Sequence, residues 1–583
     1  MFGWQGTILR VDLTTGKIRK DPLPMDLALQ YIGGGGLNAR FLFDEVTTDT
    51  DPLGPDNAFI IGVGPLVGTL APSCGRWTIT SKSVLTRAFG DTNLGGHFGS
   101  EMKFAGYDHI IIKGRAASPV YIWIDDDMVE IRRADHLWGK TCWETDDALK
   151  EELRDDQVKT AVIGPGSEVG VPFGAVIGTR YRAGGRGGGM GTVMGSKNLK
   201  AIAVRGSKTV KIANPQKAID AFEEAMVSYR ANPMREWVEK QGALALVEVY
   251  AAMGILPLRG GQTGLLDAER GHAFANNLHE KHQVTKRGCF GCPVSCIIFH
   301  DVREGPYAGA KGEKPELPAA ICFSAYHDMP TIEYGIYMTD QCNIYGIDQI
   351  EVGAIIGMAF YWYEKGLITK KDTDGLELVW GNEEAAVKLF DKIVKREGIG
   401  AVLALGVKGA VDKMGPEYDP PQGSVKGVAE VMPDVRAAKS FALGCAISPR
   451  GADHLKSLPV LERLPVEVTK SLVGSEKAAN PLIEDDKYLN CAWSEDLKTM
   501  LDEVGICLTP TMMIFGGYSP QTVAKLFSAI TGVERTWEEL KVAGERGWVA
   551  MRCFNAMHGL ARKDDTLPPG ISTVPKPNSA ALC

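Results

Sequence analysis

Residues 182–202 read RAGGRGGGMGTVMGSKNLKAI, the longest of four glycine-rich places in the chain. The others are Gly33–Gly36, Gly95-Gly96 and Gly164-Pro165-Gly166. Because glycine has no Cβ, it allows a backbone to pass close to a large ligand. All four places lie in the first part of the chain, so the sequence predicts an N-terminal region whose backbone approaches such a ligand.

The hydrophobic pattern divides the chain into three regions. Apolar or two-residue-period runs at 58–61, 109–112 and 120–124 predict strands, whereas a 3.6-residue period follows Asn214-Pro215, for example at 349–365, 383–396 and 400–414. A second break lies at 420–423, after which helices are predicted at 521–531 and 537–562. We therefore predict an α+β protein with a β-rich domain at 1–209 and two mainly helical domains at 210–422 and 423–583. The tail from Pro568 is expected to be a surface arm.

Length and composition agree with a globular protein of about three domains. The chain has 583 residues, of which 44% are hydrophobic and 23% charged. Its net charge is −8 and its basic residues are scattered, which excludes an extended phosphate-binding surface for nucleic acid. Met1–Gly6 has no signal-peptide pattern, and no apolar run reaches membrane-spanning length. We expect a cytoplasmic protein with no membrane span.

Three of the twelve cysteines form a cluster, Cys289, Cys292 and Cys296, with the spacing C-x2-C-x3-C. Three thiolates on one tight loop, predicted to lead into a helix, suit an iron–sulfur cubane whose fourth corner is held by a distant cysteine. A zinc knuckle and purely structural cysteines are the alternatives. The low cysteine density indicates a reducing compartment.

The glycine-rich segment at 182–202 resembles the pterin-binding signature of the aldehyde:ferredoxin oxidoreductase family. The opening at 6–14 and the closing stretch from Cys553 to Pro568 resemble the two ends of that family. The resemblance implies two pterins that hold one tungsten, with molybdenum as the alternative metal, beside a [4Fe-4S] cluster. It also implies a Mg²⁺ ion between the pterin phosphates, held partly by Asn93 and the carbonyl of Ala183. The residues that match the family's cofactor-binding motifs here are Arg76, Asn93, Gly95, Arg182, Ala183, Gly184 and Gly185.

Two further motifs resemble the family's Asp-x-x-Gly-Leu-(Asp/Cys) pterin contacts. The first spans Asn343–Asp348 and includes Gly346 and Ile347; the second spans Asp502–Cys507 and includes Gly505 and Ile506. Asn343 replaces the usual aspartate, and its amide oxygen can still accept a hydrogen bond. By the same resemblance, Cys507 is the fourth cluster ligand.

Two residues match the family's reacting site. His454 lies in the segment Arg450-Gly451-Ala452-Asp453-His454, and Glu316 is retained where relatives have two glutamates, the second being replaced by Pro318. Because Pro318 cannot accept a proton, either His454 or Glu316 is expected to act as the base. The implied activity is oxidation of a small-molecule aldehyde, with electrons passed to ferredoxin or to an iron–sulfur subunit of a homo- or hetero-oligomer.

Two other functions remain open at this point. One is aryl-CoA ring reduction, because the tungsten subunit of benzoyl-CoA reductases belongs to the same family and supplies a cysteine to tungsten. The alignment places Pro315 at that position, with Cys322 nearby. The other is a non-catalytic electron-transfer subunit that keeps the cluster without the pterin.

Overall fold

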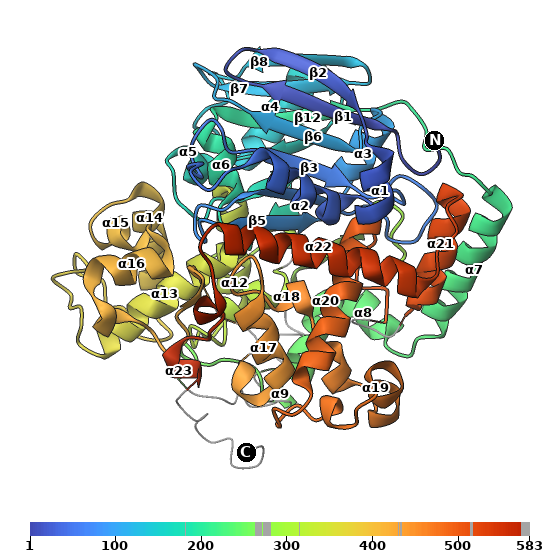
Figure 1. Ribbon diagram of the computed structural model, residues 1–583. Helices are drawn as coiled ribbons and strands as arrows, with labels where there is room; N and C mark the ends of the chain where they lie inside the picture. Colours follow the sequence, from blue (N-terminus) through green and yellow to red (C-terminus); the bar gives the residue numbers. More distant parts are fainter. Residues whose placement is uncertain are drawn as a thin grey trace.

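The computed structural model describes residues 1–180, 182–252, 254–262, 271, 281–313, 315–429, 431, 434–512 and 517–572. Its N-terminal region is rich in sheet and the rest is mainly helical, which confirms the predicted α+β class. Figure 1 shows the sheets together at one side of the molecule and the helices below and beside them. The predicted arm falls largely outside the described residues, apart from its first part up to residue 572.

Two mixed six-stranded sheets build the N-terminal region. The first has the order β2 (Lys17–Pro22), β1 (Thr7–Asp12), β6 (His109–Lys113), β3 (Phe59–Val63), β4 (Trp77–Lys82) and β5 (Phe89–Leu94). The second has the order β11 (Arg182–Gly184), β10 (Val176–Gly178), β9 (Lys159–Val162), β12 (Leu199–Arg205), β7 (Val120–Asp125) and β8 (Met128–Arg133). Leu9 and Ile79 of one sheet share a buried core with Ile122 and Val204 of the other. The apolar runs noted in the sequence are thus central strands, and burial on both faces explains why they do not alternate.

Short helices connect these strands. They are α1 (Met25–Tyr31), α2 (Gly34–Glu45), α3 (Phe98–Phe104), α4 (Cys142–Leu153), α5 (Pro165–Glu168) and α6 (Met190–Ser196). The glycine-rich segment begins in β11, which is an edge strand, and passes into α6.

The middle part of the chain is mainly helical but contains a small sheet. Its helices are α7 (Pro215–Ala231), α8 (Arg235–Gln241), α9 (Leu246–Ala252), α11 (Leu317–Cys322), α12 (Ile332–Tyr345), α13 (Gln349–Glu364), α14 (Glu383–Lys395), α15 (Ile399–Leu403) and α16 (Gly406–Met414). The sheet has the order β13 (Gln283–Arg287), β14 (Ile297–Asp301) and β15 (Lys311–Glu313). The expected helix at 400–414 is therefore interrupted between residues 403 and 406, where Gly406 takes a positive φ of 84°.

The last part of the chain is also helical, with one two-stranded sheet, β16 (Ser424–Val425) and β17 (Val428–Ala429), before its helices. The helices are α17 (Lys439–Ile447), α18 (His454–Ser457), α19 (Val466–Val473), α20 (Lys487–Val504), α21 (Pro520–Thr531), α22 (Trp537–Met557) and α23 (Pro569–Ser572). In Figure 1, α22 runs along the lower side of the N-terminal sheets, with α17 and α20 beneath it. A capping box formed by Thr536 and Glu539 fixes its start. Among the described residues, no helix is both long enough and apolar enough to cross a membrane.

Candidate active site

One cavity collects residues from all three predicted regions of the chain. The predicted site residues that line it are Arg76, Asn93, Gly95, Arg182, Ala183, Gly185, Cys289, Cys292, Cys296, Glu316, Asn343, Ile347, Asp348, His454 and Cys507. The other predicted residues do not line the cavity: Gly184, Gly346 and Ile506 lie next to lining residues in the chain, whereas Asp502 and Gly505 do not. Pro318, which stands in place of a second glutamate, also lines it.

The cysteine cluster lies in a turn between two strands. Cys289 follows β13 and Cys296 directly precedes β14, so the expectation that this loop leads into a helix is wrong. The reason is local: Ile297-Ile298-Phe299 after the last cysteine is β-branched and aromatic, which favours a strand. No three His, Cys, Asp or Glu side chains in the described part of the chain converge on a single-ion site.

Ser73 joins the two cysteine-bearing segments. Its N–H donates to the carbonyl of Gly291 at 2.8 Å, and its own carbonyl accepts from the N–H of Cys507 at 3.0 Å. Its hydroxyl donates to Sγ of Cys292 at 3.3 Å. This serine was not predicted from the sequence, where its position three residues before Arg76 is the available signal.

Two arginines reach the thiols. Arg76 Nη2 donates to Cys507 Sγ at 3.1 Å, and Arg182 Nη2 donates to Cys289 Sγ at 3.4 Å. Burial opposes the charged form of Arg76, but Cys507 and Cys289 outweigh it and raise its pKa. Burial likewise favours the neutral thiol of Cys507, yet Arg76 and Thr509 lower the pKa of this cysteine overall. Cys507 is therefore disposed to be the thiolate that metal ligation requires.

The two motifs that resemble pterin-binding motifs each form the C-terminal end of a helix. Gly346 ends α12 with a φ of 66°, and Gly505 ends α20 with a φ of 90°. Glycine takes this left-handed conformation at no steric cost, which explains the Gly in each motif. The turn after it places Asp348 and Cys507, respectively, at the cavity.

Glycines of the N-terminal region pack closely against these two helix ends. A Cβ on Gly34 would lie 2.2 Å from the carbonyl oxygen of Asp502, and one on Gly164 would lie 2.4 Å from that of Tyr345. The expectation that the glycine-rich places face a ligand is therefore wrong for these two, which contact the motifs instead. Gly95 and Gly185 do line the cavity.

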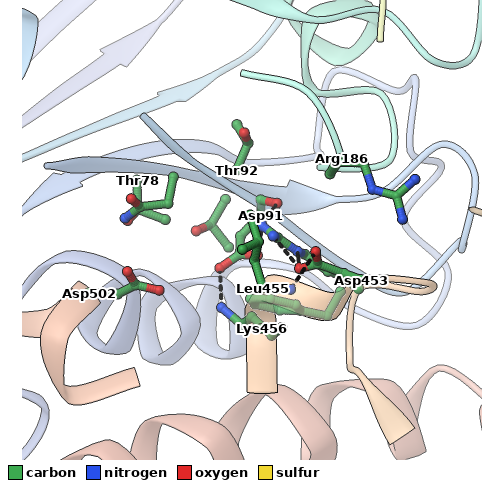
Figure 2. Close-up of polar contacts among 12 residues, drawn as sticks. Thr78, Asp91, Thr92, Arg186, Asp453, Leu455, Lys456 and Asp502 are labelled. Carbon is green, nitrogen blue, oxygen red and sulfur yellow. Dashed lines mark hydrogen bonds and ion pairs between the residues drawn. The ribbon is translucent and has the colours of Figure 1, made fainter. Parts of the chain in front are cut away.

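The polar groups of the motifs already bind protein atoms. Asp348 caps α13, because its Oδ1 accepts from the N–H of Ile350 at 2.8 Å, and its Oδ2 accepts from the N–H of Arg186. Oδ1 of Asn343 accepts from Gln349 Nε2 at 2.8 Å. Asp502 pairs with Lys498 one helical turn away, and Figure 2 shows it facing Thr78.

A buried charge network holds the turn that carries His454. Asp91 of β5 accepts from Arg450 Nη1 at 3.1 Å and from Lys456 Nζ at 2.6 Å, and Arg450 Nε donates to Asp453 at 2.6 Å. Asp453 in turn caps α18 by accepting from the N–H of Leu455 at 3.0 Å. Figure 2 shows Asp91 pointing from its strand toward this turn. The sequence analysis missed Asp91, although it lies two residues before Asn93.

His454 lies in the cavity wall at the start of α18. Its Nδ1 is buried and has no hydrogen-bond partner among the residues that the structure describes. Burial lowers the pKa of His454 to about 4, with Asp453 opposing this shift and Arg186 reinforcing it. The imidazole is therefore neutral near pH 7 and able to accept a proton.

The two acidic candidates differ in burial. Glu316 begins α11 with a side chain that is 48% exposed, and it lies 3.2 Å from Arg182 Nη1. Glu313, which the sequence analysis missed, is 5% exposed and pairs with the same nitrogen at 2.7 Å. It lies at the end of β15, and no recognised motif includes it. Cys322 is fully buried in α11 against Gly353 and does not line the cavity.

The comparisons with known proteins cover nearly the whole chain. The family model described as "Aldehyde ferredoxin oxidoreductase, N-terminal domain" matches residues 8–206, and "Aldehyde ferredoxin oxidoreductase, domains 2 & 3" matches residues 220–581. The tungsten-containing aldehyde ferredoxin oxidoreductase of Pyrococcus furiosus is 36% identical, over 99% of this chain and 93% of that protein. The aliphatic sulfonate oxidoreductase WOR-like subunit of the same organism is 32% identical, over 78% of this chain and 75% of that protein.

A solved structure has the same fold. It is described as "Active site complex BamBC of Benzoyl Coenzyme A reductase in complex with 1,5 Dienoyl-CoA", and the match has a TM-score of 0.86 and 26% identity over 98% of this chain and 91% of that one. Both family models match this chain in order, and a relative is 36% identical to it over 99% of its length. This chain therefore belongs to the aldehyde ferredoxin oxidoreductase family.

Proposed function

We propose that this chain is a tungstopterin and [4Fe-4S] enzyme that oxidises aldehydes to carboxylic acids. The observation that carries the proposal is one cavity in which four cysteines, the two arginines that reach their thiols and a neutral buried histidine meet. The family's named relatives, which contain tungsten and act with ferredoxin, support the same activity.

The residues present fit the implied cofactors. Arg182 Nε is buried without a partner among the described residues and lies at the same wall as Asn93 and Ala183. Guanidinium and backbone N–H groups bind phosphate well, so Arg76, Asn93, Gly95, Arg182, Ala183 and the glycines at 184–185 would hold the pterins and Mg²⁺. Asp348 and Asp502, with Asn343, would serve the pterin rings.

The four thiols fit a cluster. A cubane binds one thiolate at each iron, so its ligands need not converge on one point as those of a single ion do. Cys289, Cys292, Cys296 and Cys507 all line the cavity. Bound there, tungsten would supply the two-electron chemistry and the cluster would pass the electrons on singly.

The reaction requires a proton acceptor. Oxidation of an aldehyde consumes one water and yields an acid, two electrons and two protons. His454 is the proposed base, because its ring is neutral and its Nδ1 has no partner among the described residues. Glu316 is the secondary candidate, since it is half exposed and near Arg182.

The proposed electron acceptor is ferredoxin or an iron–sulfur subunit, in a cytoplasmic homo- or hetero-oligomer. The subunit that accompanies the benzoyl-CoA reductase structure is the observation that favours a hetero-oligomer.

Aryl-CoA ring reduction is the second candidate, because the solved structure with the same fold is named as a benzoyl-CoA reductase. The position of Cys322 speaks against it: this thiol is buried against α13 and outside the cavity wall, and Pro318 and Ala319 line the cavity from α11 instead. A non-catalytic role is disfavoured by the retained cofactor residues.

Anaerobically purified protein provides the test. We expect about one tungsten and four iron atoms per chain, and reduction of benzyl viologen by an aldehyde panel. Benzoyl-CoA should not be turned over with a low-potential donor. Turnover of benzoyl-CoA but not of aldehydes would replace the proposal with the second candidate, and iron without tungsten or molybdenum would support the non-catalytic role.

A further inference from the structure

Part of the cavity wall is not used by the cofactor residues. It contains Leu246, Tyr250, Val294, Leu458, Arg463 and Leu508. Arg463 is the cation in this otherwise largely apolar set. We propose that it binds an anionic group of the substrate, so that the preferred substrates are aldehydes that carry a carboxylate. This inference rests on the proposed aldehyde oxidation and specifies its substrate class.

The guanidinium of Arg463 is held by aromatic rings. Its central carbon lies 4.4 Å from the centre of the Phe441 ring and 4.8 Å from that of Tyr250. Nη1 donates to the hydroxyl of Tyr250 at 2.9 Å. Stacking against ring faces fixes the plane of a guanidinium while leaving its edge N–H groups free to bind a planar carboxylate.

The remaining donors of Arg463 have no acceptor. Nε and Nη2 are both shielded from solvent and without a hydrogen-bond partner among the described residues. The adjacent Glu462 makes no hydrogen bond to them: its Oε2 accepts from the N–H of Ser440 at 3.0 Å, and its Oε1 has no hydrogen-bond partner among the described residues. A shielded, unpaired donor loses the hydrogen bonds that it would make to water, so its presence in a cavity wall requires an explanation.

A bound carboxylate supplies that explanation. Nε and Nη2, the two unpaired nitrogens, form one edge of the guanidinium, and this edge can donate two parallel hydrogen bonds to a carboxylate. The apolar wall around it suits the carbon skeleton between the two ends of the substrate.

Arg463 and His454 line the same cavity, together with Leu458, which lies between them in sequence. One substrate in this cavity can therefore face both side chains. The aldehyde end would thus lie at the proposed base while the carboxylate lies at Arg463.

A matched pair of substrates tests the inference. 4-Formylbenzoate and 4-methylbenzaldehyde have similar sizes and differ in charge. For the wild-type holoenzyme we expect kcat/KM to favour 4-formylbenzoate by roughly ten- to hundredfold, the range that a charge-assisted hydrogen bond gives. Arg463→Gln should bring this ratio near one, and Arg463→Lys should give an intermediate ratio. Arg396→Gln, which changes an exposed arginine elsewhere, is the control and should keep the wild-type ratio.

Calorimetry of product binding gives a readout that does not depend on turnover. Terephthalate should bind the wild-type protein at least about tenfold more tightly than 4-methylbenzoate, and Arg463→Gln should remove the difference. Tungsten, iron and the unfolding temperature are measured for each variant. Loss of tungsten in both Arg463 variants would assign the arginine to the cofactor and overturn the inference.

The outcomes separate the inference from the proposed function. If both aldehydes are oxidised with similar kcat/KM and Arg463→Gln leaves the ratio unchanged, the activity stands and the anionic substrate class is wrong. If neither aldehyde is oxidised, the proposed function is wrong, and equal binding of terephthalate and 4-methylbenzoate then rejects the anion site as well.

Discussion

Lys456 donates to the carboxylate of Asp91 at 2.6 Å, which joins α18 to β5 across 365 positions of the chain. Both side chains are almost fully buried. Because β5 also carries Asn93 and α18 begins at His454, this pair fixes the proposed base relative to the strand that would serve the pterin.

We predict that Asp91→Asn lowers kcat by about tenfold or more with a smaller change in KM. The amide leaves the buried charges of Arg450 and Lys456 without their shared partner, and breaking such a pair costs about 3–5 kcal/mol. Asp108→Asn is the matched control, because it breaks the fully buried pair with Lys103 away from the cavity. Both variants should unfold at lower temperature. Equal kcat losses in the two would mean that Asp91 acts only on stability.

Replacement of Cys507 by alanine is expected to lower iron and sulfide content and cluster absorbance, since an unligated iron corner is labile. Cys445→Ala serves as the control, because this cysteine is buried and lies outside the cavity wall. Chemical analysis of iron and sulfide decides between them. A full complement of iron in the Cys507 variant would remove this residue from the ligand set.

The pH dependence of kcat/KM should reflect the low pKa of the buried His454. Burial lowers the pKa of His454 to about 4, so the ring stays neutral as the pH falls from 8 to about 5. We expect kcat/KM to fall only as the pH approaches about 4, well below the usual histidine pKa of about 6.5. His454→Asn should reduce kcat by about 10²–10⁴ and remove this acid limb. A limb that survives in the variant would belong to another group.

Of the two glutamates at Arg182, Glu313 should matter more for the cofactor. Glu313→Gln removes the buried ionic partner of Arg182, whereas Glu316→Gln changes a half-exposed group at a longer distance. We expect lower tungsten content and a lower unfolding temperature for the first variant and near-normal values for the second. Metal analysis and calorimetry measure both. The reverse order would show that Arg182 depends on Glu316.

Gly164→Ala should destabilise the protein by several kcal/mol, because the new Cβ would lie 2.4 Å from the carbonyl oxygen of Tyr345. Gly335→Ala is the control within α12, where the nearest atom would lie at 3.6 Å. It should be neutral or stabilising by about 0.5–1 kcal/mol, as expected for alanine in a helix. Denaturant unfolding compares the two, and equal stabilities would contradict the role of Gly164 as a close contact.

The sequence predicted elements whose pattern is strong and local. The runs at 58–61 and 109–112 overlap the central strands β3 and β6. The periodic segments at 349–365 and 521–531 match the helices Gln349–Glu364 and Pro520–Thr531, because apolar periodicity and caps act within each segment. The cysteine loop leads into a strand rather than the expected helix, because Ile297-Ile298-Phe299 is β-branched and aromatic and pairs with the neighbouring strands β13 and β15. The motif residues were predicted because each belongs to a recognisable sequence motif. The sequence colours in Figure 1 show that the elements that contain these motifs come from distant parts of the chain. Ser73, Asp91, Glu313 and Arg463 were missed because each acts through contacts with segments that are distant in the sequence, and such contacts leave no periodic signal.

The bonds of Ser73 also bear on how the holoenzyme is made. Its backbone links the turn of Cys289–Cys296 to Cys507, so the four thiols come together only after three distant segments have docked. Cys507 follows Cys289–Cys296 by a long stretch of chain. A cluster held by all four thiols, as proposed, would therefore be completed only after this later segment has been synthesised and has docked against Ser73.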